Sequence, residues 1–241
     1  MNSLPNFQLL RDDRFPRSST YSAELIAECD MGPNVLWLTE FLCEVMDLRA
    51  GMRVLDLGCG KALSSIFLAR EFGVEVWATD LWISATENAQ RIQREAMERQ
   101  IFPIHADARD LPYAEDYFDA VVSVDAFEYF GTDSSFVGLL VKHLKPGCQI
   151  GVVNAGLIRE VDEMPKEWPD DFCTFHTPEW WKRHWEITRQ VKVEIADQLP
   201  NGREFWMKWN KGVGVTNDEY LTSAAGDNLG IHRIVARRVV R

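Results

Sequence analysis

Short apolar runs alternate with longer amphipathic stretches through the central part of this 241-residue chain. Apolar runs bounded by glycine or polar residues are typical of buried strands, and apolar residues three or four apart indicate helices. The pattern predicts strands over 51–58, 74–80, 101–107, 117–125 and 145–154, and helices over 34–48, 61–73, 82–100 and 132–144. This alternation implies right-handed crossovers and a parallel sheet covered on both faces.

The regularity weakens after Asn154. The expected elements are a loop-like segment over 155–176, a helix from Thr177 and Pro178, an irregular aromatic stretch over 201–212, and strands over 191–199 and 230–240. Six of the nine tryptophans lie between Trp168 and Trp209. They indicate either the core of a subdomain or a wall over a ligand cleft.

The length suits one large domain. We expect residues 31–241 to form it, with a cap region over about 155–225. Residues 1–30 show weak periodicity and several turn formers, which fits an N-terminal arm or lid, or a disordered segment.

The net charge of −11 argues against a general affinity for nucleic acid or for an anionic membrane surface. The chain begins without the apolar core of a signal peptide, and no stretch approaches the ~20 apolar residues of a membrane span. Five scattered cysteines without metal-ligand spacing predict reduced thiols in a cytoplasmic protein and no metal site. The composition leaves an oligomer open.

The segment RVLDLGCGKALSS, residues 53–65, predicts a ligand-binding turn after a buried strand. A phosphate-binding P-loop is excluded because Leu55 and Ala62 replace its first glycine and its hydroxyl residue. A dinucleotide fingerprint is weakened because Leu63 stands at its third glycine. Asp56 would favour an ammonium or sulfonium and oppose a pyrophosphate. S-adenosylmethionine (SAM), which carries both cations, therefore fits best.

Two further carboxylates follow predicted strands. Asp80 ends the second strand, where an acidic side chain can accept hydrogen bonds from ribose hydroxyls of SAM or of a dinucleotide. Asp107 ends the third strand, where its carboxylate could take an adenine amino group. Ligands of parallel sheets bind beyond the carboxyl ends of the strands, so these residues should share one site with the glycine turn.

Taken together, VLDLGCGKA, VWATD, ADARDLPYAEDYFDAVVSVDAF and LKPGCQIGVV resemble the class I SAM-dependent methyltransferases, including the small-molecule and cyclopropane-fatty-acid-synthase-like groups. The resemblance covers roughly residues 50–155. It implies a Rossmann-like, doubly wound sheet of seven strands whose last strand is antiparallel, with the aromatic-rich cap inserted after strand five.

The resemblance also implies roles for individual residues. Those expected to contact SAM are Asp56, Gly58, Cys59 and Gly60 around the methionine end, Asp80 at the ribose, Leu81, Asp107 and Ala108 at the adenine, and Ser123 and Asp125 near the methionine amine. The family often has a third glycine where this chain has Ala62.

Acidic and phenolic side chains follow the fourth strand. DAFEY resembles the D-x-x-x-H segment of glycine/sarcosine and phosphobase methyltransferases, which methylate small amines, with Tyr129 where those enzymes place histidine. Asp125, Glu128 and Tyr129 are therefore candidate catalytic residues, and His176 is a further candidate base. A phenol is a poor base at neutral pH, whereas a carboxylate could bind a cationic acceptor.

The leading interpretation is a methyltransferase that moves the methyl group of SAM to a small-molecule acceptor such as an amine. In a variant of this interpretation, the methyl acceptor is a lipid. The alternatives are a non-catalytic SAM-binding protein and a nucleotide-dependent oxidoreductase.

Overall fold

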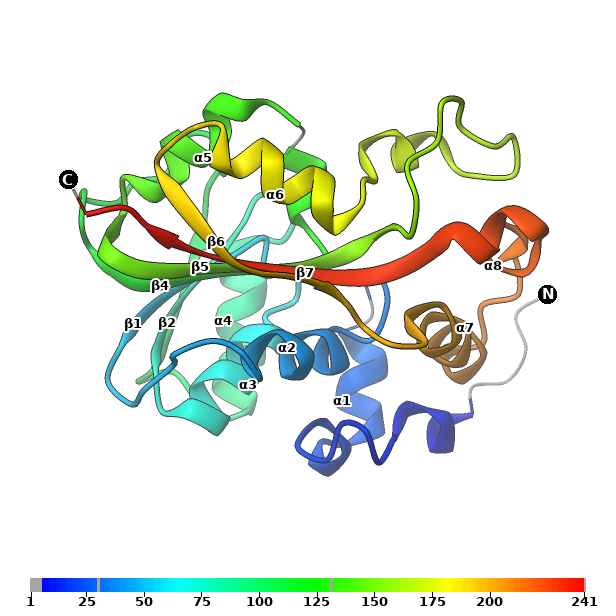
Figure 1. Cartoon of the computed structure of the whole chain (residues 1–241). Helices are drawn as coiled ribbons and strands as arrows, with labels where there is room; N and C mark the ends of the chain where they lie inside the picture. Colours follow the sequence, from blue (N-terminus) through cyan, green and yellow to red (C-terminus); the bar gives the residue numbers. More distant parts are fainter. Residues whose placement is uncertain (1–5, 30, 131, 241) are drawn as a thin grey trace.

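The computed structural model describes residues 6–29, 31–130 and 132–240. Seven strands form one sheet in the order β3-β2-β1-β4-β5-β7-β6 (Figure 1). The strands are β1 Arg53–Leu57, β2 Glu75–Asp80, β3 Ile101–His105, β4 Phe118–Val124, β5 Leu144–Leu157, β6 Val191–Gln198 and β7 Leu229–Arg238. Only β7 runs antiparallel to its neighbours, β5 and β6. The predicted seven-stranded sheet with an antiparallel last strand is confirmed.

Helices cover both faces of the sheet, with α1 to α4 and α7 on one side and α5 and α6 on the other (Figure 1). The α-helices are α1 Ala23–Glu28, α2 Val35–Cys43, α3 Leu63–Phe72, α4 Ala85–Arg94, α5 Ser134–Val141, α6 Pro178–Glu186, α7 Gly202–Val213 and α8 Glu219–Thr222. The 3₁₀ helices are η1 Phe7–Leu10, η2 Ser18–Thr20, η3 Phe127–Phe130, η4 Asp170–Thr174 and η5 Ala224–Asn228. Successive side chains of β1 point to opposite faces of the sheet. Val54 belongs to the hydrophobic core on the side of α2, and Leu55 to the core on the side of α5.

Side-chain caps set several helix ends as the sequence predicts. Asn34 Oδ1 accepts hydrogen bonds from the backbone N–H groups of Leu36 and Trp37 at the start of α2. The Thr177 side chain caps α6 in the same way, with Pro178 at the first helical position. At the C-terminal end of α3, Gly73 takes the left-handed conformation that ends the helix.

The expected irregular stretch over 201–212 is instead helix α7, so this prediction was wrong. Phe205, Trp206 and Trp209 recur three or four residues apart and are buried or half-buried on the face that meets the core. Asn201 precedes the helix in the left-handed conformation without a side-chain cap. The Asn-Gly pair resembles a turn in sequence, although Asn201 is a residue type that often precedes a helix.

The aromatic residues of the C-terminal third mostly form buried clusters. Trp181 and Trp185 pack around Phe127 between α6 and the sheet. The ring of Phe172 stacks on that of Phe175 with centroids 4.2 Å apart, in a separate cluster with Trp168 and Trp206. Five of the six tryptophans from Trp168 to Trp209 are buried, and their main role is core packing.

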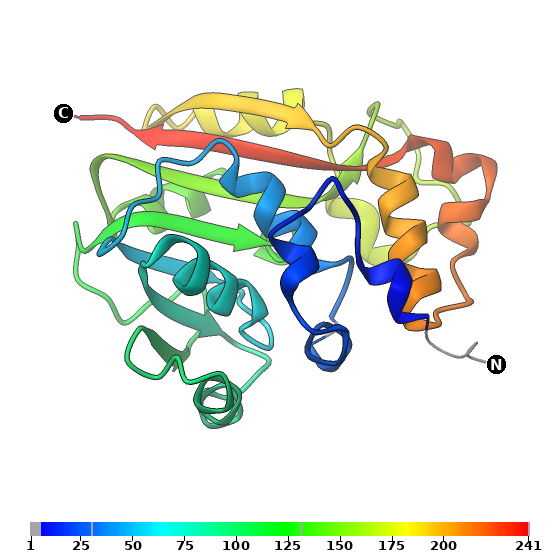
Figure 2. The same ribbon diagram turned by 90° about the horizontal axis from the view of Figure 1, so that it is seen from below.

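The described N-terminal segment packs beside the sheet's helices, with η1 against α7 and η2 against α2, while Tyr21 contacts Phe67 of α3 (Figure 2). The Phe15 ring stacks on Trp37 with centroids 5.6 Å apart. The buried Glu40 carboxylate accepts hydrogen bonds from the Ser18 N–H and hydroxyl at 2.8 and 2.6 Å. Residues 1–5 of the expected arm lie outside the described residues, and a lid function stays a prediction.

Among the described residues, no helix has both the length and the apolar character needed to cross a membrane.

Candidate active site

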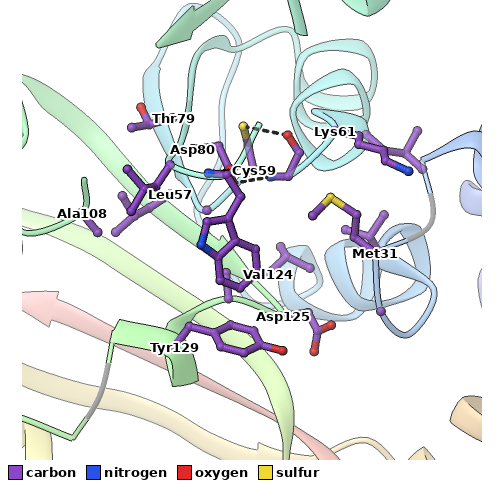
Figure 3. A pocket seen from close by; sticks show the side chains of 18 of the residues that line it. Met31, Leu57, Cys59, Lys61, Thr79, Asp80, Ala108, Val124, Asp125 and Tyr129 are labelled. Carbon is purple, nitrogen blue, oxygen red and sulfur yellow. Dashed lines mark hydrogen bonds between the residues drawn. The ribbon is translucent and has the colours of Figure 1, made fainter. Parts of the chain in front are cut away.

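A cleft of about 1090 Å³, measured to its open mouth, lies at the carboxyl ends of β1, β2 and β4 (Figure 3). This is the point at which the strand order reverses in an open parallel sheet. Its floor is the turn after β1, and its walls come from the segments after β2, β3 and β4, from Met31–Val35 and from α7.

The glycine turn forms the floor because its backbone takes conformations that suit glycine. Gly58 and Gly60 have φ values of 72° and 52°. The N–H groups of Gly58 and Cys59 donate to the Thr79 carbonyl at 2.8 and 3.1 Å, which fastens the turn to β2. A Cβ on Gly58 would lie 2.5 Å from the Cβ of Ala126, so a larger residue does not fit. Ala62, at φ 62°, occupies a third left-handed position where a glycine would be unstrained.

Asp80 holds this turn as well as lining the cleft. Its Oδ2 accepts a hydrogen bond from the Gly60 N–H at 2.8 Å. Its Oδ1 accepts from the N–H groups of Trp82 and Ile83 at 2.7 and 2.8 Å. The carboxylate is 7% exposed. It therefore ties the turn after β1 to the turn after β2.

Asn88 on α4 supports the same turn from below. Its Nδ2 donates to the Gly60 carbonyl at 2.9 Å, and its Oδ1 accepts from Arg91 Nη1 at 3.1 Å. The side chain is 1% exposed. This contact could not be predicted from the sequence, because the helical position of Asn88 alone gives no sign of it.

Asp56 and Ser123 lie beneath the cleft rather than in its wall. Asp56 Oδ2 accepts hydrogen bonds from both Ser64 and Ser65 hydroxyls at 2.6 Å, while Oδ1 is buried without a partner. Burial raises the pKa of Asp56 to about 6. The Ser123 hydroxyl donates to the Leu57 carbonyl at 2.8 Å. The structure thus gives both residues a place under the turn, although the resemblance implied contacts with the ligand.

The end of the cleft beyond β2 and β3 holds three of the expected residues, Leu81, Asp107 and Ala108. Leu81 is about half exposed, and Ala108 is buried. Asp107 Oδ1 accepts a hydrogen bond from the Arg109 N–H at 2.8 Å, which shapes the turn after β3. Cys59 also lines the cleft, and burial raises the pKa of its thiol well above the usual range.

The opposite end of the cleft holds Asp125 and Tyr129 (Figure 3). Asp125 follows β4 with a φ of 49°, an uncommon conformation for a residue other than glycine. Burial raises the pKa of Asp125 to about 7. The half-exposed Tyr129 meets the exposed ring of Trp82 edge-on, with centroids 5.1 Å apart. The two aromatic side chains meet from the segments that follow β4 and β2.

Glu128 lies behind Asp125 and is 4% exposed. Its carboxyl group hydrogen-bonds to the Asp125 carboxylate, and burial next to this negative charge raises the Glu128 pKa well above its ordinary value. With the amide of Asn154 oriented to satisfy its neighbours, Asn154 Nδ2 donates to Glu128 Oε2 at 3.0 Å.

His176 is separated from this group and does not line the cleft. Its Nδ1 pairs with Glu160 Oε2 at 2.9 Å. Its ring stacks on Trp180 with centroids 3.7 Å apart. Glu160 also accepts hydrogen bonds from the N–H and hydroxyl of Thr177, the cap of α6. These contacts indicate a structural role at the start of α6.

The cleft also contains residues that sequence reasoning missed. Trp209 reaches it from α7, and Met31, Gly32 and Pro33 from the segment before α2. Trp82 follows Asp80 closely enough that its place after a strand could have indicated it. The others arrive through tertiary packing, of which the sequence carries no local sign. The described residues contain no cluster of histidine, cysteine or carboxylate side chains able to hold a metal ion.

Comparison with known proteins agrees with this geometry. The family described as "Methyltransferase domain" matches residues 54–147. Methyltransferase GfsG of Streptomyces halstedii is 29% identical over 58% of this chain and 51% of its own length. Cyclopropane-fatty-acyl-phospholipid synthase of Escherichia coli K12 is 31% identical over 44% of this chain and 27% of its own length. The chain thus spans about half the length of these curated relatives, or less.

Among solved structures, phosphoethanolamine N-methyltransferase 2 of Haemonchus contortus, in complex with phosphomonomethylethanolamine and S-adenosylhomocysteine, has the same fold. Its TM-score is 0.74 at 18% identity, over 98% of this chain and 61% of that protein. The motifs, the sheet order and the family match agree with one another. Residues 54–147 of this chain therefore match the methyltransferase-domain family.

Proposed function

We propose that this protein transfers the methyl group of SAM to a small-molecule acceptor by in-line displacement and releases S-adenosylhomocysteine. One observation carries the proposal. The glycine turn, pinned by Asp80, lies at the floor of a cleft whose two ends differ in chemistry, with Asp107 and Ala108 at one end and Asp125 and Tyr129 at the other. A cofactor and an acceptor could meet over that floor.

The cofactor half offers the contacts that SAM needs. In this proposal Gly58, Cys59 and Gly60 pass beneath the methionine and ribose, and Leu81, Asp107 and Ala108 surround the adenine. A carboxylate offers about four lone-pair sites, and three N–H groups already use those of Asp80. We infer that Asp80 has about one lone-pair site left, so it can accept a hydrogen bond from one of the two ribose hydroxyls and not from both.

We propose an amine as the acceptor. The acceptor half presents the carboxylate of Asp125, with Glu128 behind it, and the aromatic rings of Tyr129 and Trp209. Carboxylates and aromatic faces both attract an ammonium group. A neighbour of the same fold was solved with a methylated amine, which supports this choice. A lipid acceptor, as in the synthase from Escherichia coli, is the competing choice.

The five cysteines are free thiols, two of them at least partly exposed, which supports a proposal that the protein works in a reducing compartment such as the cytoplasm.

The test is transfer of label from methyl-labelled SAM, read by mass spectrometry, first with phosphoethanolamine, glycine and their N-methylated forms and then with a metabolite extract. We expect a labelled small molecule and one S-adenosylhomocysteine per transfer. SAM binding without transfer to any of these would favour the non-catalytic SAM-binding alternative. Absence of SAM binding in a parallel titration would refute the cofactor assignment itself.

A further inference from the structure

The acceptor end of the cleft contains a carboxyl pair, formed by Asp125 and Glu128, whose two members differ in exposure. Asp125 lines the cleft and is partly exposed, whereas Glu128 is 4% exposed and sits behind it. The Glu128 carboxyl hydrogen-bonds to the Asp125 carboxylate. Two carboxylates this close cannot both be ionised at low cost, so one of them keeps a proton.

The surroundings decide which member keeps it. The Ala155 N–H donates a hydrogen bond to Asp125, which favours the charged form of that residue. Glu128 receives the Asn154 amide but is fully enclosed and faces the charge of Asp125. The proton therefore resides on Glu128, and Asp125 carries the single negative charge of the carboxyl pair.

The other titratable groups near the carboxyl pair do not neutralise it. Asp171 of η4 adds a negative charge, and Tyr129 of η3 and Tyr220 of α8 are neutral phenols. Among the described residues, the charges and hydrogen bonds that act most strongly on Asp125 and Glu128 include no cation, and the lysine and arginine that line the same cleft are Lys61 and Arg109. A cationic ligand would complete the charge balance.

Asp125 is also held in place from the side of the cleft. A Cβ added to Gly32 would lie 2.1 Å from Asp125 Oδ2, so the segment before α2 closes directly against this oxygen. The Asp125 N–H donates to the Val153 carbonyl at 2.8 Å. The strained conformation of Asp125, with φ at 49°, is thereby fixed from both sides.

An amine acceptor must arrive as a neutral nucleophile, although a free alkylamine is protonated at neutral pH. We propose that Asp125 takes the proton of the bound ammonium acceptor, and that Glu128 keeps its own proton so that Asp125 is available as a lone base. This proposal rests on the proposed methyl transfer to an amine, and it makes Asp125 rather than Tyr129 the catalytic base.

The ammonium N–H bond breaks, and its proton moves to an Asp125 carboxylate oxygen. The freed nitrogen lone pair then forms a bond to the methyl carbon, while the carbon–sulfur electron pair stays on sulfur. The products are the N-methylated ammonium and neutral S-adenosylhomocysteine, and Asp125 afterwards releases its proton to water.

Infrared spectroscopy tests the carboxyl pair without depending on turnover. At about pH 8.5 ordinary carboxyl groups are ionised, as are Asp56, with its pKa of about 6, and Asp125, with its pKa of about 7. We expect one protonated-carboxyl stretching band, lost in Glu128→Gln and kept in the matched control Asp171→Asn. A spectrum without the band, or a band that survives in Glu128→Gln, overturns the assignment of the proton to Glu128.

Kinetics with the amine that accepts label test the base. We expect Asp125→Asn to lower kcat by about 10²- to 10⁴-fold, the usual contribution of general base catalysis, with SAM affinity within about twofold of wild type. If instead SAM affinity falls tenfold or more while kcat is retained, Asp125 serves the methionine amine and the base proposal is wrong. Lack of transfer by wild type to any amine refutes the proposed function, and the infrared result then still decides whether the carboxyl pair holds a proton.

Discussion

Replacement of Asp80 is the sharpest test of the cofactor half of the cleft. Asp80→Ala removes one carboxylate that accepts three backbone hydrogen bonds, at 2.8, 2.7 and 2.8 Å, and lines the cleft. A hydrogen bond to a charged group contributes about 1.5–3 kcal/mol. Water can replace part of this at Trp82, which is exposed, but less readily at Gly60. We therefore expect the free energy of unfolding to fall by about 2–4 kcal/mol.

SAM affinity should fall as well. The lost ribose contact alone should cost about 1–3 kcal/mol, which corresponds to about 5- to 150-fold in Kd. Isothermal titration with SAM and with S-adenosylhomocysteine measures this, and urea unfolding measures the stability. Asp107→Asn is the matched control, since Asp107 accepts one backbone hydrogen bond within its own turn and otherwise forms an exposed ion pair with Arg109. It should unfold like wild type and bind SAM more tightly than Asp80→Ala does.

Asp80→Asn separates the two roles of the carboxylate. With its oxygen toward Trp82 and Ile83, the amide nitrogen faces the Gly60 N–H, so only the bond to the glycine turn is lost. We expect an intermediate SAM affinity. Wild-type affinity in a folded Asp80→Ala protein would show that the cofactor does not lie on this turn.

Four further changes probe the site. Asn88→Leu removes the hydrogen bond to the Gly60 carbonyl and should weaken SAM binding by about 3- to 10-fold in titration; unchanged affinity would show that the turn needs no support from α4. Tyr129→Phe should slow methyl transfer while SAM affinity stays near wild type, and an equal rate would exclude the hydroxyl from the reaction. His176→Ala should leave kcat within about twofold, because His176 does not line the cleft; a large loss would contradict that placement. Burial raises the pKa of Asp56 from 3.8 to about 6, so the folded state binds the proton more tightly, and the contribution of Asp56 to the free energy of unfolding should fall by about 2 kcal/mol between pH 4 and 6. Asp56→Asn should remove this contribution, and parallel curves for the two proteins would refute it.

The alternation of strands and helices was predictable because each element carries its own local signal. Asn34 caps α2 and Gly73 closes α3, as the residue types suggested. The glycine turn was equally predictable, because Gly58 adopts a backbone conformation that other residues rarely take. Helix α7 was missed because Asn201 and Gly202 resemble a turn. The aromatic residues that follow were interpreted as an irregular segment rather than as one face of a helix.

The depth at which a side chain lies was harder to predict. Asp56 stands next to the glycine turn in sequence, yet it points into the protein toward Ser64 and Ser65 because residues of a strand alternate between its faces. Trp209 lies far from the turn in sequence, yet it lines the same cleft. The position of Asp56 follows from which face of β1 its side chain takes. The position of Trp209 depends on how α7 packs against the rest of the protein, and no local sequence pattern encodes that packing.

The order of the strands has a consequence for how the cleft is assembled during synthesis. Strand β7 is made after β6 but lies between β6 and β5, so β6 lacks its neighbour until β7 has been inserted. Trp209 belongs to the segment that joins β6 to β7. A growing chain could therefore complete the half of the cleft around Asp80 first, while the half around Trp209 waits for β7. A ribosome-bound chain that stops before β7 should form the glycine turn without a finished acceptor wall.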